Sequence, residues 1–261
     1  MSGQNGDTFR KRFLAGELLV GSFVKTPTSH TIEVLGDVGF DFVVIDEEHG
    51  PFDRLAIDHA ILAARAAGTA PIVRVAEPTA AKLLSVLDDG AAGVLVPHVS
   101  SVAKAREIVS ACRYRGGKRG FSNTTRAGRF GRYSMWEHVD ISDAATTVIA
   151  MIEDPEALDE IDAILAVDGL DGVFIGRGDL TVAFGAETQA SAPVRDAVDR
   201  IVAAASAAGK PVCVMVGSAA DAEPFRPMGI NTFIVGSDQT FLRQAATKVV
   251  TDFSAPIGAR R

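Results

Sequence analysis

Polar side chains follow several short apolar segments of this sequence, and their types suit acid–base and metal chemistry. Four of them, Asp46, Glu47, Glu48 and His49, come directly after the apolar residues at 42–45. The pattern recurs further along the chain with Arg74, His98, Glu153, Asp154, Arg177 and Asp179. Carboxylates, histidines and arginines gathered at one site could bind a divalent cation, move a proton and hold an anion.

Glu153 and Asp179 are the candidate metal ligands. Carboxylate oxygens suit a hard divalent cation, and oxygens of water and substrate could complete an octahedron around it. Two structural alternatives stay open at this point. Asp154, next to Pro155, could begin a helix, and Asp179 could pair with Arg177.

Arg74 and His49 are the candidates for substrate binding and proton transfer. A charge inside the apolar segment PIVRVA is costly without a partner, and a guanidinium fork suits a carboxylate or an enolate. The alternative for Arg74 is an internal ion pair with Glu48. His49 could move a proton near neutral pH or could be a loop histidine at a helix start. His98 could be a second base or a hydrogen-bonding residue of the rim.

Two further features bear on the substrate. The glycines of the segment 176–180 (GRGDL) could let backbone N–H groups approach a carboxylate or phosphate, or could simply form a tight turn. Lys25 ends the first apolar segment and could form a Schiff base with a ketoacid, in which case no metal would be needed. The alternative is a solvated lysine.

The apolar segments are predicted strands, and the alanine-rich stretches between them are predicted helices. The expected strands are 18–24, 42–48, 71–76, 93–99, 147–153, 172–176, 211–216 and 231–236. The expected helices are 53–67, 79–88, 101–112, 155–166, 194–208 and 239–253. Expected N-caps are Asp53, Thr79 and Ser101, and expected helix-ending glycines are Gly68, Gly90, Gly169 and Gly209.

This alternation predicts an α/β fold with a parallel sheet covered by helices. Eight strands indicate a (β/α)8 TIM barrel, and the first strand lacks the GxGxxG turn of a doubly wound open sheet. We expect residues 1–261 to form a single domain, with an N-terminal segment at 1–16 and a loose tail at 254–261. The long irregular stretch 114–143 is expected to be a functional or interface loop. In a barrel, the polar strand ends all meet at one rim.

Charge and composition exclude several other classes. A net charge of -7 argues against a nucleic-acid binder, which needs a basic face. The polar N-terminus shows no signal peptide, and no apolar run is long enough to cross a membrane, so we expect a cytoplasmic protein. Cys112 and Cys213 form no CxxC pair and are expected to be buried and reduced.

The chain resembles the class II, pyruvate-dependent aldolases of the HpcH/HpaI family, which includes 4-hydroxy-2-oxoheptanedioate and 2-dehydro-3-deoxyglucarate aldolases. The similarity runs from about residue 21 to residue 253. It is carried by these segments: FDFVVIDEEHGPFD, PIVRVAEP, LLSVLDDGAAGVLVPHVSS, ACRYRGGKRG, AMIEDPEAL and VDGLDGVFIGRGDLTVAFG.

This resemblance implies a role for each matching residue. Glu153 and Asp179 would bind a divalent metal (Mg2+, Mn2+ or Co2+), and the backbone of Gly178 and Asp179 would hold the pyruvate carboxylate. Arg74 would hold the pyruvate carbonyl, and His49 would act as acid and base through water. Asp46 would be the near neighbour of His49, and Asp88 would reach His49 across a subunit boundary. The resemblance also implies a homohexamer, a trimer of dimers, that exchanges the C-terminal helix.

The sequence departs from the family pattern at a few positions. Arg115 and Gly116 stand where relatives often have two prolines, Met151 stands where some have glutamine, and Arg177 replaces a common proline. These departures leave the metal chemistry intact and bear on the aldehyde partner. We therefore expect an aldolase that cleaves or forms 4-hydroxy-2-oxoacids from pyruvate and an aldehyde. The alternatives are an oxaloacetate decarboxylase or related acyl lyase, and a non-catalytic barrel that binds a ketoacid.

Overall fold

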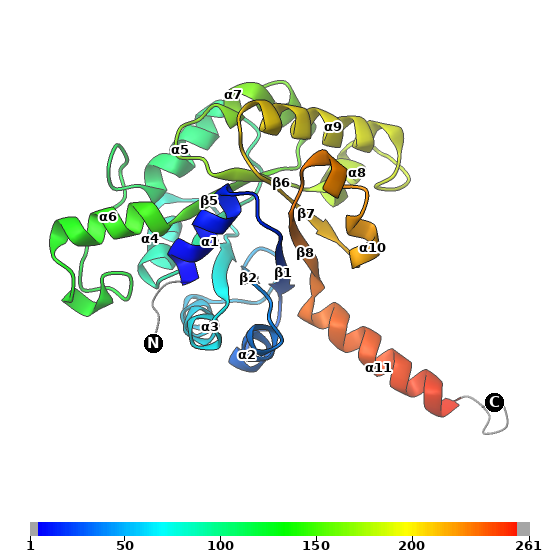
Figure 1. Cartoon of the computed structure of the whole chain (residues 1–261), viewed down its shortest axis with the longest axis horizontal. Helices are drawn as coiled ribbons and strands as arrows, with labels where there is room; N and C mark the ends of the chain where they lie inside the picture. The colour runs from blue at the N-terminus through cyan, green and yellow to red at the C-terminus, as the bar shows by residue number, and fades with distance from the viewer. Residues whose placement is uncertain (1–4, 255–261) are drawn as a thin grey trace.

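The fold is a closed barrel of parallel strands in a computed structural model that describes residues 5–254 (Figure 1). Its strands are β1 Leu19–Val24, β2 Phe42–Asp46, β3 Ala70–Arg74, β4 Gly93–Val96, β5 Thr147–Ile152, β6 Gly172–Ile175, β7 Val212–Val216 and β8 Thr232–Ser237. Each strand pairs with the next, and β8 pairs with β1. The predicted TIM barrel is confirmed, and most polar residues of the expected rim lie at or just after the strand ends.

Helices surround this barrel and follow most of the strands. They are α1 Asn5–Leu14, α2 Ser29–Asp37, α3 Arg54–Ala67, α4 Ala80–Asp88, α5 Val102–Cys112, α6 Met135–Ala145, α7 Ile161–Leu165, α8 Arg177–Ala183, α9 Ala192–Ala207, α10 Ala219–Ala222 and α11 Asp238–Ser254. The side chains of the expected N-caps each accept a hydrogen bond from the first turn of α3, α4 or α5. The expected helix-ending glycines all have positive φ.

Two expectations about the helices were wrong. The stretch 114–143 is not irregular throughout, because α6 begins within it at Met135 behind a capping box formed by Ser134 and Glu137. The helix expected at 155–166 is divided into a short 3-10 turn at Pro155–Leu158 and the brief α7.

The barrel interior is filled from one end by the N-terminal helix. Phe9 and Phe13 of α1 belong to the interior cluster of apolar residues, and the Phe9 ring lies 5.1 Å from the ring of Phe42. Arg10 on the same helix donates to Asp171 at 2.7 Å. In Figure 1, α1 lies in the middle of the ring of strands. Helix α1 therefore closes the end where the strands begin, and the opposite end carries the polar residues.

Helix α11 leaves the barrel and projects away from it (Figure 1). Its first residue, Asp238, is buried and accepts hydrogen bonds from the backbone N–H groups of Lys25 at 2.9 Å and Thr26 at 3.0 Å. From residue 239 to residue 254 the side chains are exposed or half-buried, and Leu242 and Phe253 are 72% and 86% exposed. The expected tail lies outside the described residues except at residue 254.

The remaining compositional expectations concern cysteines and membranes. Cys112 and Cys213 are buried and free, as predicted, and burial raises the pKa of the Cys112 thiol to about 12. Between residues 5 and 254, no helix combines the length and the apolar character that crossing a bilayer requires. The cytoplasmic location stays a prediction.

Candidate active site

Arg74 is held at the end of β3 by a buried carboxylate from the neighbouring strand. Asp46 and Arg74 are register partners in the β2–β3 pair, so their side chains emerge side by side. Arg74 donates through Nε and Nη2 to the two carboxylate oxygens of Asp46, at 2.8 and 2.6 Å. Its guanidinium also lies 4.6 Å from the ring centroid of Phe23. Its third nitrogen, Nη1, lies 3.3 Å from Glu48 Oε2.

Asp46 is fully buried and is surrounded by donors. Burial alone would raise the pKa of its carboxyl group, but the hydrogen bonds and charge of Arg74 lower the pKa overall. The N–H of His49 donates to Asp46 at 3.1 Å, which confirms that these two residues are neighbours. Lys25 Nζ is 3.4 Å from Asp46. The lysine amine is therefore paired with a carboxylate and is not simply solvated.

His49 lies on the open rim above this network. More than half of its side chain is exposed, and its Nε2 is 3.8 Å from a Glu48 oxygen, too far for a hydrogen bond. Glu48 is mostly buried and lies between Arg74 and the two histidines, with its other oxygen 3.9 Å from His98 Nε2. The structural alternative for Arg74 was an ion pair with Glu48, and the structure shows that pair together with a closer one to Asp46.

Glu153 is the most unusual acid of the site. It follows β5, is only 3% exposed, and accepts a hydrogen bond at Oε1 from the N–H of His98 at 2.8 Å. Burial and, to a smaller extent, the charge of Asp179 raise the pKa of its carboxyl group to about 7. Asp179 lies in the first turn of α8, after β6. A buried carboxylate next to a second acid, with a pKa this high, is an environment that a bound cation would stabilise.

The sequence offered two structural alternatives, a helix cap for Asp154 and an ion pair with Arg177 for Asp179, and the structure shows neither. Asp154 makes no side-chain cap, and its two oxygens instead lie 3.1 and 3.2 Å from His98 Nδ1. Arg177 points toward β7, where it donates to the carbonyl of Met215 at 2.5 Å and stacks 4.8 Å from the ring centroid of Phe225. Arg177 is thus engaged away from Asp179, which leaves the Asp179 carboxylate for another partner.

The protein groups available to a metal are two carboxylates. Over residues 5–254, no group of three or more His, Cys, Asp or Glu side chains is arranged to hold an ion. Glu153 and Asp179 therefore fit a cation that takes its remaining ligands from water and substrate, as magnesium commonly does. The N–H groups of Gly178 and Asp179 lie in the first turn of α8, where backbone donors lack helical partners. Met151 is buried in the barrel interior and adds no polar atom to this site.

Asp88 is not brought to this site within one chain. It is the last residue of α4, which runs back toward the end of the barrel where strands begin, and Arg119 binds it at 2.9 Å. His49 is on the opposite rim. A role for Asp88 at His49 therefore needs a second copy of the chain, and it stays a prediction.

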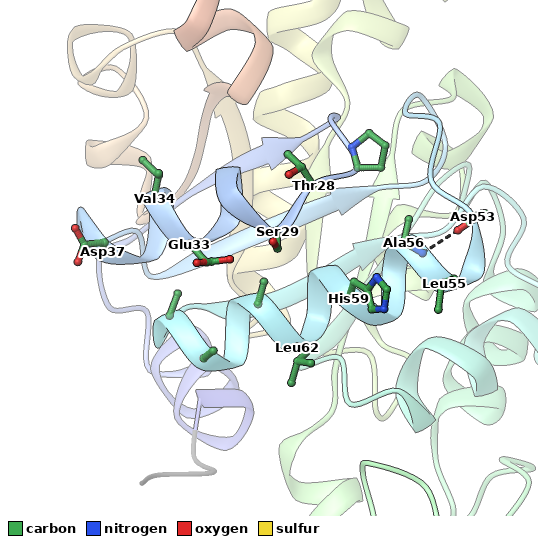
Figure 2. Close-up of a pocket in the computed structure, with 14 residues that line it drawn as sticks. Thr28, Ser29, Glu33, Val34, Asp37, Asp53, Leu55, Ala56, His59 and Leu62 are labelled. Atoms are coloured by element: carbon green, nitrogen blue, oxygen red, sulfur yellow. Dashed lines mark hydrogen bonds between the residues drawn. The ribbon is translucent and has the colours of Figure 1, made fainter.

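A separate hollow of about 1160 Å3 lies on the outer face between α2 and α3. Figure 2 shows Ser29 and Glu33 of α2, together with His59 and Leu62 of α3, lining this groove. None of the predicted site residues lines it. The candidate site is thus defined by the polar strand ends and not by this groove.

Comparisons with known proteins agree with this fold and define the class of the protein. The sequence matches the HpcH/HpaI aldolase/citrate lyase family over residues 19–245, and the chain belongs to this family. A 5-keto-4-deoxy-D-glucarate aldolase of Enterobacter sp. (strain 638) is 34% identical over 247 residues, which cover 94% of this chain and 96% of the relative. The chain is therefore a carbon–carbon lyase of the aldolase type.

Two solved structures are similar over nearly their whole length. An HpcH/HpaI aldolase/citrate lyase family protein from Burkholderia cenocepacia J2315 has a TM-score of 0.90 at 26% identity, covering 95% of this chain and 100% of that chain. A citrate synthase has a TM-score of 0.84 at 32% identity, covering 93% of this chain and 96% of that chain. The two similar structures are thus named for different reactions that make or break carbon–carbon bonds.

Proposed function

We propose that this protein is a divalent-metal-dependent aldolase that cleaves or forms 4-hydroxy-2-oxoacids, with pyruvate and an aldehyde as the other reactants. Membership of the aldolase family supports the reaction class. The observation that carries the metal requirement is Glu153, a buried carboxylate beside Asp179 whose raised pKa a cation would offset. Mg2+, Mn2+ and Co2+ all suit such an oxygen site.

Several residues of the rim have a part in this proposal. A divalent ion held by Glu153 and Asp179 would supply positive charge where negative charge develops on the ketoacid. The N–H groups of Gly178 and Asp179 bind the pyruvate carboxylate, and Arg74 Nη1 donates to the pyruvate carbonyl oxygen. Asp46 acts as a positioning residue, since it is buried and holds Arg74 through both oxygens.

Cleavage then needs two proton transfers and the breaking of one bond. His49, through water, takes the proton from the C4 hydroxyl of the substrate. The C3–C4 bond breaks, the aldehyde leaves, and the electron pair stays on the pyruvate fragment, whose C3 then takes up a proton to give pyruvate. In the reverse direction the pyruvate fragment attacks an aldehyde, and His49 returns the proton. The exposed position of His49 on the rim supports this role.

The identity of the natural aldehyde acceptor is the most specific part of the proposal. The Enterobacter relative is named for 5-keto-4-deoxy-D-glucarate, a hydroxylated ketoacid, and we propose substrates of this general class for this chain. A related acyl lyase or decarboxylase reaction is a second candidate, because the similar structure at 32% identity is a citrate synthase. Turnover that depends on an aldehyde separates the two.

Exchange of the pyruvate methyl protons in D2O, followed by NMR, tests the proposal without knowledge of the aldehyde. We expect exchange with Mg2+ or Mn2+, and a loss of at least about 100-fold with EDTA or in Glu153→Gln and Asp179→Ala. Asp199→Asn, an exposed acid on α9, is the matched control and should exchange normally. Exchange that survives EDTA would instead favour a Schiff base at Lys25. If the folded, metal-replete protein shows no exchange, the proposed aldolase function is contradicted. The remaining hypothesis is then a non-catalytic barrel that binds a ketoacid.

We further propose that the working molecule is a homo-oligomer, a hexamer built as a trimer of dimers, in which α11 is exchanged between subunits. The support is the projection of α11 from its own barrel with apolar side chains exposed along it. An oligomer would also allow Asp88 of one copy to approach His49 of another.

A further inference from the structure

His98 has a backbone conformation that costs energy for any residue with a side chain. Its φ is 53°, in the left-handed region that favours glycine. The residue follows β4, and its side chain is 54% exposed, so burial of the ring does not impose this conformation. Strain of this kind persists where surrounding groups fix it, and it gathers at functional sites.

The conformation directs one N–H group at one oxygen. The His98 N–H donates to Glu153 Oε1 at 2.8 Å and so links the end of β4 to the end of β5. Glu153 is almost completely buried, and a hydrogen bond to a carboxylate in such a place is stronger than one in water. Oε1 is thereby fixed on the β4 side.

The second oxygen of Glu153 faces the other way. A Cβ added to Gly176, at the end of β6, would lie 2.6 Å from Glu153 Oε2 and would clash with Glu153 Cβ. Oε2 is therefore on the β6 side, and Asp179 follows Gly176 by three residues. Within the described part of the chain, no hydrogen-bond donor is found for Oε2. The two oxygens thus have different surroundings, one occupied by an amide and one turned toward the second acid.

Contacts on each side of His98 hold the strained backbone in place. The ring Nδ1 lies 3.1 and 3.2 Å from the two oxygens of Asp154. The N–H of Val99 donates to the Met151 carbonyl at 3.1 Å. The Asp154 contact and the Val99 bond both lead to the end of β5, so this end and the His98 turn are fixed together.

We propose that His98 is a positioning residue whose backbone N–H occupies Glu153 Oε1 and leaves Oε2 as the oxygen that faces the cation. The inference rests on the proposed metal-dependent function. The N–H and the left-handed backbone carry the role, and the imidazole serves to hold that backbone through Asp154. A residue that cannot adopt positive φ would turn the N–H away and release the Glu153 carboxylate.

Variants at position 98 separate the backbone from the ring. His98→Gly keeps the N–H and adopts positive φ without strain, and His98→Asn tolerates it. His98→Val is β-branched and opposes this conformation, and His98→Ala is a milder form of the same change if the valine variant does not fold. The readouts are the Mn2+ dissociation constant of EDTA-stripped protein by calorimetry, the melting temperature, and pyruvate proton exchange as a function of metal concentration.

We expect His98→Gly and His98→Asn to bind Mn2+ within about 3-fold of the original chain, and His98→Val or His98→Ala to bind about 10-fold more weakly. The half-saturating metal concentration for exchange should rise to match, while the rate at saturating metal changes little. Equal affinity in all four folded variants would overturn the inference, as would a glycine variant as weak as the valine variant, which would assign the role to the ring. Absence of Mn2+ binding by the unaltered chain would overturn the metal site itself and this inference with it.

Discussion

At the scale of single residues, Glu153 shows how burial changes the acidity of an ordinary carboxyl group. Burial, with a smaller contribution from Asp179, raises its pKa to about 7 from 4.5. Part of the population is therefore protonated near neutral pH in the absence of a cation. The hydrogen bond from His98 opposes this rise but does not cancel it.

This raised pKa predicts the pH dependence of stability in the metal-free protein. Because the folded state holds the Glu153 proton up to about pH 7 and the unfolded state loses it near pH 4.5, the stabilising contribution is complete below pH 4.5. It is lost as pH rises through 7. We expect urea unfolding in EDTA to show a loss of about 1–3 kcal/mol between pH 4.5 and pH 8 that Glu153→Gln lacks. An identical pH profile in the two proteins would contradict the assignment.

At the scale of secondary structure, the pairing of β1 with β8 closes the barrel, and a contact just beyond the two strands reinforces it. Asp238 begins α11 directly after β8, and its two carboxylate oxygens accept the N–H groups that follow β1. Both bonds are charge-assisted, and the side chain is buried.

Removing this contact should weaken the whole fold. We expect Asp238→Ala to lower the free energy of unfolding by about 1–3 kcal/mol, because two partly buried backbone donors lose their charged acceptor. Urea denaturation measures the change. Gln239→Ala, the exposed neighbour on the same helix, should change it by less than about 0.5 kcal/mol. A similar effect in both variants would show that the bonds to Asp238 contribute little.

The strands could be predicted from the sequence more fully than the helices. All of the strands appear as apolar runs, because a parallel barrel buries both faces of each strand. Helix α2 was missed because its sequence, SHTIEVLGD, is short and carries β-branched residues of low helix propensity. The position of helix α1 at the end of the barrel was not predicted. No local sequence pattern indicates that Phe9 and Phe13 pack inside a barrel formed by distant segments.

The residues of the site could be predicted, but several of their partners could not. Strand ends converge in any barrel, and this placed Arg74, His98 and Glu153 on one rim. The partner of Arg74 depends on the register that sets it opposite Asp46, which no local pattern encodes. The hydrogen bond from the His98 N–H to Glu153 depends on a left-handed backbone conformation, which is uncommon for residues other than glycine and which no local pattern predicts.

At the scale of the whole molecule, α11 packs on its own barrel near its start, where Phe241 lies 6.1 Å from Phe40, whereas residues 242–254 are all exposed. Leu242, Val249 and Phe253 are spaced by seven and four residues, so they share one face, and all are exposed. Apolar side chains arranged in this way mark a surface that another molecule covers.

We expect this face to control assembly. Light scattering should give a multimeric mass for the unaltered chain and a smaller mass for the double variant Leu242→Asp, Phe253→Asp, because charges on the apolar face oppose its burial. Thr251→Asp lies about half a turn from Leu242 around the helix and should keep the original mass. A monomeric unaltered chain would contradict the proposed oligomer.

The pairing of β1 with β8 also has a consequence for how the chain matures during synthesis. Leu19 of β1 pairs with Thr232 of β8. One edge of β1 therefore stays unpaired until β8, the last strand, has been synthesised. Until then, the growing chain carries an open row of backbone donors and acceptors of the kind that recruits other strands. Contacts of such large sequence separation also slow folding. The ring therefore cannot close on a nascent chain before β8, and with it the Asp238 contact, has left the ribosome.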